Sequence, residues 1–183
     1  MMIGLKPFLV LITLSGPVKA QDWSSGVAMR AQERSSHETL VALIERSDTT
    51  LAPFQTDGCS GGLSEAWQRV AGQFPNFSQV HHSSPPWEAC CRIHDRAYHD
   101  AANVSDSTDS FEARLTADLA LRSCVISAGT DRVDALVEVY DVNPEKIESA
   151  YESIAEAMYL AVRIGGAPCS GLPWRWGYGY PTC

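Results

Sequence analysis

Apolar residues recur along much of the chain at the three- and four-residue spacing of an amphipathic helix. The clearest such segment runs from Phe111 to Ser127. A second one begins at Pro144, after a capping Asn143, and ends at the glycine pair 165–166. No stretch of useful length alternates between apolar and polar residues as a half-buried strand does. The pattern therefore predicts an all-α fold.

Shorter helices are expected on weaker signals. Ser35 and Glu38 have the spacing of a capping box, which predicts a helix start at Ser35. Pro86 suits the first turn of a helix that carries several polar side chains. The expected short helices cover about 35–44, 64–70, 86–101 and 132–140. Segments rich in turn-forming residues are expected to be loops, namely 53–63, 72–86 and 102–109.

The first twenty residues have the layout of a secretory signal peptide. Lys6 gives a positive head, residues 7–14 are apolar, residues 15–17 break the run, and the small residue Ala20 ends it. The apolar run is short for a bilayer, which takes ~20 residues; an uncleaved membrane anchor is the alternative. We therefore expect cleavage near Ala20 and a secreted protein, extracellular or periplasmic. An N-terminal helical segment would then cover 21–52.

Composition narrows the class of protein further. The chain has 183 residues, of which 45% are hydrophobic, which is typical of one globular domain. Lys and Arg number 14 against 22 Asp and Glu, and a net charge of −8 argues against nucleic acid as a partner. Six cysteines in an exported chain predict disulfides rather than free thiols.

Candidate chemistry lies on the helix expected from Pro86. Cys90, His94 and Tyr98 are four residues apart and share one face of that helix, and Cys91 and Asp95 share the neighbouring face. A histidine beside an aspartate on a helix is commonly only a solvated surface. Two further features of the sequence favour a functional interpretation.

The first feature is Asp118, which falls on the apolar stripe of the segment 111–127 between Leu115 and Leu121. A buried carboxylate needs a partner, and an imidazole fixed through one ring nitrogen would be available as a base at the other. If Cys90 bridges Cys124, the two helices run antiparallel. His94 then lies ~6 Å and Asp118 ~9 Å along their helices from the bridge, within side-chain reach.

The second feature is the glycine-rich loop from Thr56 to Gly62. Its glycines allow carbonyl oxygens to converge on one point, and a hard cation such as Ca²⁺ takes six to eight oxygen ligands. A Cys59–Cys91 bridge would bring this loop onto Asp95, one turn along the helix from Cys91. By itself, however, such a loop is more often a plain turn.

Together these residues resemble the motifs of the secreted phospholipases A2, in a prokaryotic-like form. The resemblance spans about 55–125 and lies in Cys90-Cys91-x-x-His94-Asp95-x-x-Tyr98, the Gly-Cys-x-Gly-Gly loop before it, and an Asp six residues ahead of a Cys after it. It implies a disulfide-stapled phospholipase A2-like domain over 53–183. In that fold two antiparallel catalytic helices lie beside a Gly-rich calcium loop.

Site roles follow from the resemblance by position. His94 is implied as the general base that activates water, Asp118 as the group that orients His94, and Tyr98 as the support of Asp118. The implied Ca²⁺ ligands are Asp57, Gly58, Ser60, Gly62 and Asp95. The implied disulfides are Cys59–Cys91, Cys90–Cys124 and Cys169–Cys183. Ala97 departs from the pattern, because animal members of the family have a Cys there.

The resemblance implies a Ca²⁺-dependent carboxylic ester hydrolase that cleaves the sn-2 ester of phospholipids at a bilayer or micelle surface. We expect it to act as a monomer. A non-catalytic module of similar fold that binds lipid or protein is the main alternative. Gly58-x-Ser60-x-Gly62 also matches the nucleophile elbow of serine hydrolases, and Cys90, Cys91, His94 and His99 could be a zinc site. The aromatic tail 174–180 suits either a membrane boundary or packing on the helices.

Overall fold

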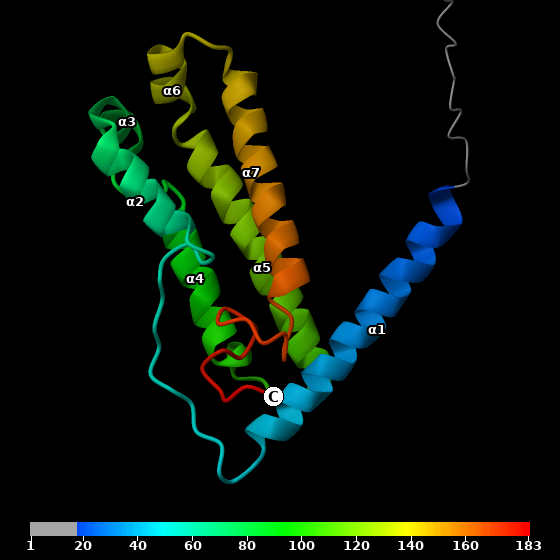
Figure 1. The fold of residues 1–183 in the computed structure, drawn as a ribbon. Helices are drawn as coiled ribbons and strands as arrows, with labels where there is room; N and C mark the ends of the chain where they lie inside the picture. The colour runs from blue at the N-terminus through cyan, green and yellow to red at the C-terminus, as the bar shows by residue number, and fades with distance from the viewer. Residues whose placement is uncertain (1–17) are drawn as a thin grey trace, which may run out of the picture.

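The computed structural model describes the backbone of residues 18–183 and the side chains from residue 30 onward. This part of the chain is all-helical and has no strand, which confirms the predicted fold class. The elements are α1 (Val18–Ile44), α2 (Leu63–Gln73), α3 (Pro75–His81), α4 (Glu88–His99), the 3₁₀ turn η1 (Ala101–Asn103), α5 (Ser107–Thr130), α6 (Val133–Tyr140) and α7 (Pro144–Gly165). Figure 1 shows α4, α5 and α7 side by side, with α1 crossing at an angle and the C-terminal tail at the end opposite α6.

The helix α5 is the centre of the molecule and packs against α7, α4 and α1 (Figure 1). It runs antiparallel to α4, because Cys90 near the start of α4 is bridged to Cys124 near the end of α5. Gly129 allows α5 and α7 to approach closely, since a Cβ atom there would lie 2.3 Å from the Tyr151 ring. The predicted antiparallel pair of helices is therefore present.

Two buried clusters hold these helices together. The larger one surrounds Trp87, Leu121 and Tyr151, where α4, α5 and α7 meet. The smaller one joins Leu40 of α1 to Tyr98 of α4 and to Trp176 of the tail. Leu40 is fully buried, and truncating such a side chain to Ala commonly costs about 2–5 kcal/mol. Residues 30–44 thus belong to the same core as the helices that follow.

Two of the predicted helix starts are wrong. Ser35 does not begin a helix, because α1 runs without a break from Val18 to Ile44. Its neighbour Ser36 donates to the carbonyl of Gln32 and Thr39 donates to that of Ser35, which is mid-helix bonding rather than capping. The helix α4 begins at Glu88, with Trp87 at its N-cap position, two residues later than Pro86.

Two of the predicted loops are partly helical. The segment 72–86 contains α3, a short helix with Pro75 in its first turn, whose Phe77 packs on Trp67 with ring centroids 5.0 Å apart. The segment 102–109 ends in the first turn of α5, because the Asp106 carboxylate accepts from the N–H groups of Thr108 and Asp109. Gly129, expected to close this helix, lies inside it. The predicted helix start at Pro144 is confirmed with Asn143 at the N-cap position, but the Asn143 side chain makes no capping hydrogen bond.

The aromatic tail packs on the helices, which was one of its two predicted arrangements. Trp176 is fully buried and its indole N–H donates to Ser110 Oγ at 2.9 Å. Tyr178 donates to the carbonyl of Gln55 at 2.6 Å. The Cys169–Cys183 disulfide closes the tail on itself.

The predicted signal peptide lies almost wholly in residues 1–17, outside the described residues. Its last three residues belong to the first turn of α1. From residue 18 onward, the helices are all too short or too polar to cross a membrane.

Candidate active site

His94 and Asp118 are in contact, as their positions on two antiparallel helices predicted. The Nε2 atom of His94 lies 2.8 Å from Oδ1 of Asp118, and both side chains are buried. A carboxylate can only accept, so Nε2 carries the proton of the neutral ring. Nδ1 is therefore left as the basic nitrogen of the imidazole.

Tyr98 supports the same carboxylate. Its hydroxyl donates to Asp118 Oδ1 at 2.7 Å and accepts from Nε of Arg114 at 3.1 Å. Burial, together with the charge of Asp118, raises the pKa of Tyr98 even though Arg114 acts in the opposite direction. The phenol thus remains a neutral donor toward Asp118.

Two arginines that the sequence analysis did not select also surround Asp118. Arg163 of α7 donates from Nη1 to Oδ2 of Asp118 at 2.8 Å, and Nε of Arg114 lies 3.9 Å from the same oxygen. Burial raises the pKa of Asp118. The hydrogen bond from His94, the charge of Arg114 and the hydrogen bonds from Tyr98 and Arg163 outweigh it, so the net pKa is lowered. Asp118 is consequently an anion that accepts hydrogen bonds at both oxygens.

A third missed residue completes this group. Glu33 of α1 accepts from Nη2 of Arg163 at 2.7 and 2.6 Å and also from Nη1 of Arg114. Arg114 could have been found from the sequence, because it lies four residues before Asp118 and shares its helix face. Glu33 and Arg163 are far apart in the chain, and no local pattern links them. We call Glu33, Arg114, Asp118 and Arg163 the ion cluster.

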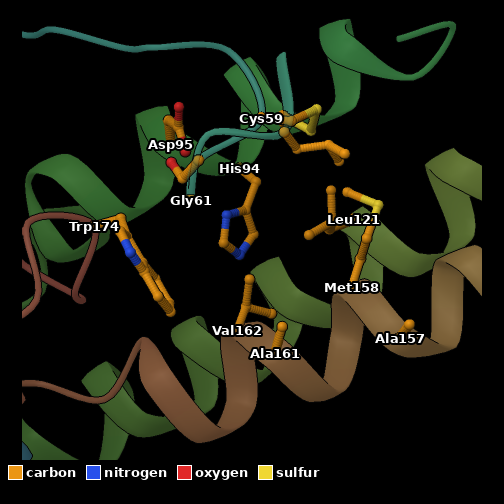
Figure 2. Close-up of a pocket in the computed structure, with 13 residues that line it drawn as sticks. Cys59, Gly61, His94, Asp95, Leu121, Ala157, Met158, Ala161, Val162 and Trp174 are labelled. Carbon is orange, nitrogen blue, oxygen red and sulfur yellow. A yellow bond between two sulfur atoms is a disulfide. The ribbon is translucent and has the colours of Figure 1, made fainter. Parts of the chain in front are cut away.

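An apolar cavity of about 320 Å³ opens beside His94. Figure 2 shows the imidazole in the middle of this hollow, with Trp174 on one side and Leu121 and Met158 on the other. The floor is formed by small and aliphatic side chains of α7, namely Ala157, Ala161 and Val162. A basic nitrogen thus lies at the wall of a cavity suited to a hydrocarbon chain.

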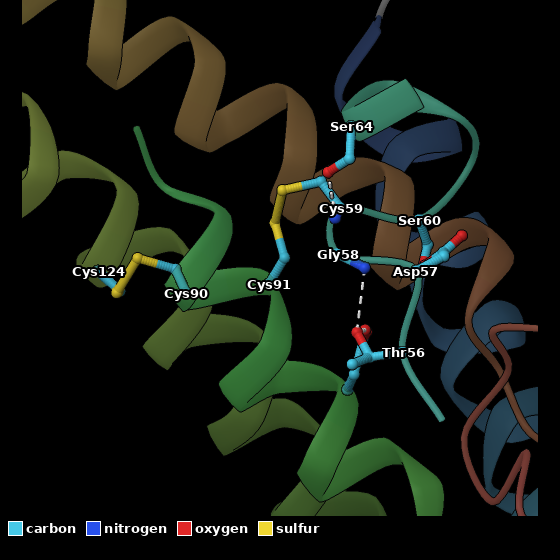
Figure 3. Close-up of a disulfide and its surroundings, with 10 residues drawn as sticks. Thr56, Asp57, Gly58, Cys59, Ser60, Ser64, Cys90, Cys91 and Cys124 are labelled. Atoms are coloured by element: carbon cyan, nitrogen blue, oxygen red, sulfur yellow. Dashed lines mark hydrogen bonds between the residues drawn. A yellow bond between two sulfur atoms is a disulfide. The ribbon is translucent and has the colours of Figure 1, made fainter. Parts of the chain in front are cut away.

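The glycine-rich loop is fixed to α4 next to this cavity (Figure 3). The Cys59–Cys91 disulfide joins the two segments, and the N–H of Cys59 donates to Ser64 Oγ at 2.8 Å. Gly58 has φ +81°, and a Cβ there would lie 2.7 Å from both Ser64 Oγ and Glu88 Oε1. Only glycine fits that position. All three disulfides join the pairs that the resemblance implied.

Asp57, Ser60 and Asp95 line a second hollow of about 290 Å³, which shares Ser60, Asp95 and Trp174 with the apolar cavity. Thr56 Oγ1 donates to Asp95 Oδ2 at 2.5 Å, and Ser60 Oγ donates to Asp57 Oδ1 at 3.0 Å. Burial raises the pKa of Asp95. The charge of Asp57 also raises it, whereas Thr56 and His94 lower it. Two carboxylates and no basic side chain line this hollow, so a hard cation fits its donor set.

The other two predicted ligands, Gly58 and Gly62, belong to the same loop but are not among the residues that line this hollow. The carbonyl of Gly62 accepts from the N–H of Ala66 in the first turn of α2 at 2.8 Å, which leaves it one lone pair for another partner. In the described part of the chain, no group of three His, Cys, Asp or Glu side chains is arranged around a metal position. A cation here would therefore depend on two carboxylates together with loop oxygens.

The structure contradicts one alternative and weakens another. Cys90 and Cys91 are both in disulfides, as are all six cysteines, so they cannot be zinc ligands. His99 Nε2 lies 2.9 Å from the carbonyl of Ala52, and the ring packs on Phe54. Ser60 hydrogen-bonds to Asp57 and follows no strand in the described chain, whereas a nucleophile elbow joins a strand to a helix.

Comparison with protein-family models, with curated proteins and with solved structures finds no match to this chain. No relative therefore supplies a role for any residue of the candidate site. The contact of His94 with Asp118, the apolar cavity and the oxygen-lined hollow are the features from which a function can be inferred.

Proposed function

We propose that the protein is a secreted, Ca²⁺-dependent phospholipase A2-like hydrolase that releases the fatty acid from the sn-2 ester of phospholipids. The motif shared with the secreted phospholipases A2 supplies the reaction class. The observation that carries the proposal is the buried hydrogen bond from His94 to Asp118, beside an apolar cavity and an oxygen-lined hollow. This is the arrangement that a histidine base needs in order to act on an ester with a long apolar chain.

In the proposed mechanism, His94 is a general base. Nδ1 takes a proton from a water molecule, whose oxygen attacks the ester carbonyl carbon, and Asp118 stabilises the imidazolium that forms. When the tetrahedral intermediate breaks down, Nδ1 gives this proton to the departing alcohol oxygen. The products are a free fatty acid and a lysophospholipid, and His94 is neutral again.

Asp57 and Asp95, with the loop oxygens of Gly58, Ser60 and Gly62, would hold Ca²⁺. When bound, Ca²⁺ would supply positive charge close to the carbonyl oxygen, where negative charge develops in the reaction. The chain itself positions the substrate. The cavity between Trp174 and Met158 would hold the acyl chain, which would put the ester near His94 and the loop.

Three features support export and a phospholipase A2-like fold. All six cysteines are paired, as in proteins of oxidising compartments. The antiparallel pair of α4 and α5 carries His94 and Asp118 on facing surfaces. The signal-peptide layout of residues 1–20 supports removal of that segment before the protein reaches a phospholipid surface. We further propose that it acts there as a monomer.

Hydrolysis of phosphatidylcholine vesicles by the purified mature protein tests the proposal. Phospholipids with different acyl chains at the two positions show which ester is cut, and reactions with excess chelator show dependence on Ca²⁺. The expected result is release of the sn-2 fatty acid with Ca²⁺ only, and no release by the His94→Gln variant. Vesicle binding by the wild type without release of fatty acid would instead support the non-catalytic module.

A further inference from the structure

Asp118 is contacted from two sides, and the side away from His94 belongs to neither α4 nor the glycine-rich loop. Its Oδ1 faces His94 and Tyr98, and its Oδ2 accepts from Arg163 of α7. A guanidinium free to turn could cover both oxygens of a carboxylate at once, because Arg binds carboxylates through two parallel N–H groups. Arg163 would then compete with His94 for Asp118. Another side chain must therefore restrict Arg163 to a single oxygen of Asp118.

Glu33 of α1 is the group that holds it. Both Glu33 oxygens accept from Nη2 of Arg163, which leaves Nη1 for Asp118. Glu33 also accepts from Arg114, which further donates to the backbone carbonyls of Val162 and Arg163. The Glu33 side chain is 11% exposed, so little water screens these pairs. Each arginine is thus anchored away from His94.

The charges of the ion cluster balance. Glu33 and Asp118 carry one negative charge each, and Arg114 and Arg163 carry one positive charge each. Burial acts to raise the pKa of Glu33, but neighbouring His37 and the charges of Arg114 and Arg163 bring it to about 2. Glu33 is therefore ionised at any pH at which the site operates. Without the charge of Glu33, the buried Arg114 and the largely buried Arg163 would face a single carboxylate.

We propose that Glu33 is a positioning residue of the candidate active site, which fixes Arg163 and Arg114 so that Asp118 Oδ1 stays directed at His94 Nε2. The inference rests on the proposed function for its catalytic meaning. It makes α1, which lies outside the region that resembles a phospholipase A2, a working part of the site. Glu33 itself touches neither substrate nor reacting atoms.

The test is a Glu33→Gln variant of the mature protein, which removes the charge and keeps the size of the side chain. Released Arg163 then turns further onto Asp118, and His94 loses the partner that fixes its tautomer. We expect kcat to fall about 10- to 100-fold, with little change in KM or in the dissociation constant for Ca²⁺. Glu38→Gln makes the same change at an exposed position of the same helix and is expected to leave kcat unchanged.

A second readout does not need catalysis. ¹⁵N spectra of histidine-labelled protein at fixed pH 8 report which ring nitrogen of His94 carries the proton, and His94→Gln identifies its signals. The wild type should show the Nε2–H form alone, and Glu33→Gln a mixture of both tautomers. Glu33→Asp retains the carboxylate on a shorter side chain and should recover part of both the kcat and the single tautomer.

The outcomes separate the two proposals. If the wild type hydrolyses no phospholipid but Glu33→Gln still mixes the tautomers, the positioning role stands and the proposed function fails. Unchanged kcat and an unchanged tautomer in Glu33→Gln, with only a lower melting temperature, would show a purely structural residue and overturn the inference. If Glu33→Gln does not fold, the Glu33→Asp variant takes its place. A Glu33→Asp variant that is less stable than the wild type but keeps the wild-type kcat and the single His94 tautomer would also overturn the inference.

Discussion

His94 and Asp95 are neighbours on α4 and both line the apolar cavity, yet the polar groups around them differ in character. Around His94 the polar groups are buried and already partnered, and the charges of the ion cluster balance. Around Asp95, two carboxylates face an open hollow that no basic side chain lines. This difference in surroundings agrees with the roles proposed for the two residues, His94 as a base and Asp95 as a cation ligand. A base that handles protons works best in a preorganised network, whereas a cation site must leave oxygens and negative charge free for its ligand.

The sharpest test of this contrast substitutes His94 and Asp95 one at a time. We expect His94→Gln to lower hydrolysis at least about 10³-fold, because the base is lost, and to leave Ca²⁺ binding largely intact. Asp95→Asn should lose both, because it removes one of two carboxylates of the cation site. Calorimetric titration with Ca²⁺ and vesicle assays measure the two effects. Equal loss of Ca²⁺ binding in both variants would show that the two regions are not separate.

The Asp118→Asn substitution directly tests the hydrogen-bonded groups around His94. The amide cannot stabilise a protonated His94 as a carboxylate does, so turnover should fall by about 10²- to 10⁴-fold. Arg163 and Arg114 would lose half of their countercharge. Denaturant unfolding should therefore show a loss of about 3 kcal/mol, as for other broken buried ion pairs. Wild-type turnover in a folded variant would contradict the role of Asp118.

The two disulfides of α4 form a matched pair, because they close segments of 32 and 34 residues. Replacing either pair by Ser should cost about 2–5 kcal/mol of stability. Only the loss of Cys59–Cys91 should also weaken Ca²⁺ binding, because this disulfide, unlike Cys90–Cys124, joins the glycine-rich loop to α4. Calorimetry on both double variants measures the difference. Equal weakening would mean that the loop is held in place by other contacts.

Acid should remove the stabilisation that the Glu33 carboxylate gives to the ion cluster. The pKa of Glu33 is about 2 in the folded protein and 4.5 in the reference state, so the unfolded chain takes up the proton more readily. The stabilisation by this carboxylate is complete above about pH 4.5 and is lost as the pH falls towards 2. It amounts to at most about 3 kcal/mol.

Urea unfolding of the wild type and of Glu33→Gln across this pH range measures that contribution. The two stability curves should be separated at pH 7 and should converge towards pH 2. A separation that does not change with pH would show that the Glu33 charge contributes nothing to stability.

The smallest effect is expected at Thr56, which donates to Asp95 from the loop side. Thr56→Val should lower the stability of the Ca²⁺-free protein by about 1 kcal/mol. It should retain Ca²⁺ binding, because the Asp95 oxygen that Thr56 occupies becomes free for the ion. Thr56→Ser keeps the hydroxyl and is the control. Thermal melts with and without Ca²⁺ decide this, and loss of binding in Thr56→Val would make Thr56 a necessary part of the cation site.

Local periodicity was enough to predict α5, α7 and the burial of Asp118, because the helical repeat alone places that residue on the apolar stripe. It was not enough for α3, whose helix is supported by packing of Phe77 on Trp67. It also failed for the first half of α1, where polar residues show no period and the helix is joined to the core through Leu40. Tertiary contacts decide such segments, and a single sequence does not display them.

The residues of the candidate site also fall into two groups, those that local sequence patterns predict and those that only tertiary contacts bring together. His94, Asp95 and Asp118 belong to short-range patterns and were found, whereas Glu33 and Arg163 meet only in the folded chain. The sequence separation of Glu33 and Arg163 does not predict their contact. Helix periodicity and disulfide pairing predict contacts between residues within a few turns, but not contacts between two helices far apart in the sequence.

The pairing of Glu33 with Arg163 joins residues 130 positions apart, and Trp176 reaches back to Ser110 over 66 positions. Contacts of such long range form late in folding, because the entropy of closing the intervening chain must be overcome first. α4 and α5 can pair early, but the network behind His94 waits for both α1 and α7. A partly synthesised chain therefore has His94 and Asp118 before the arginines and the glutamate that surround this pair can be in place.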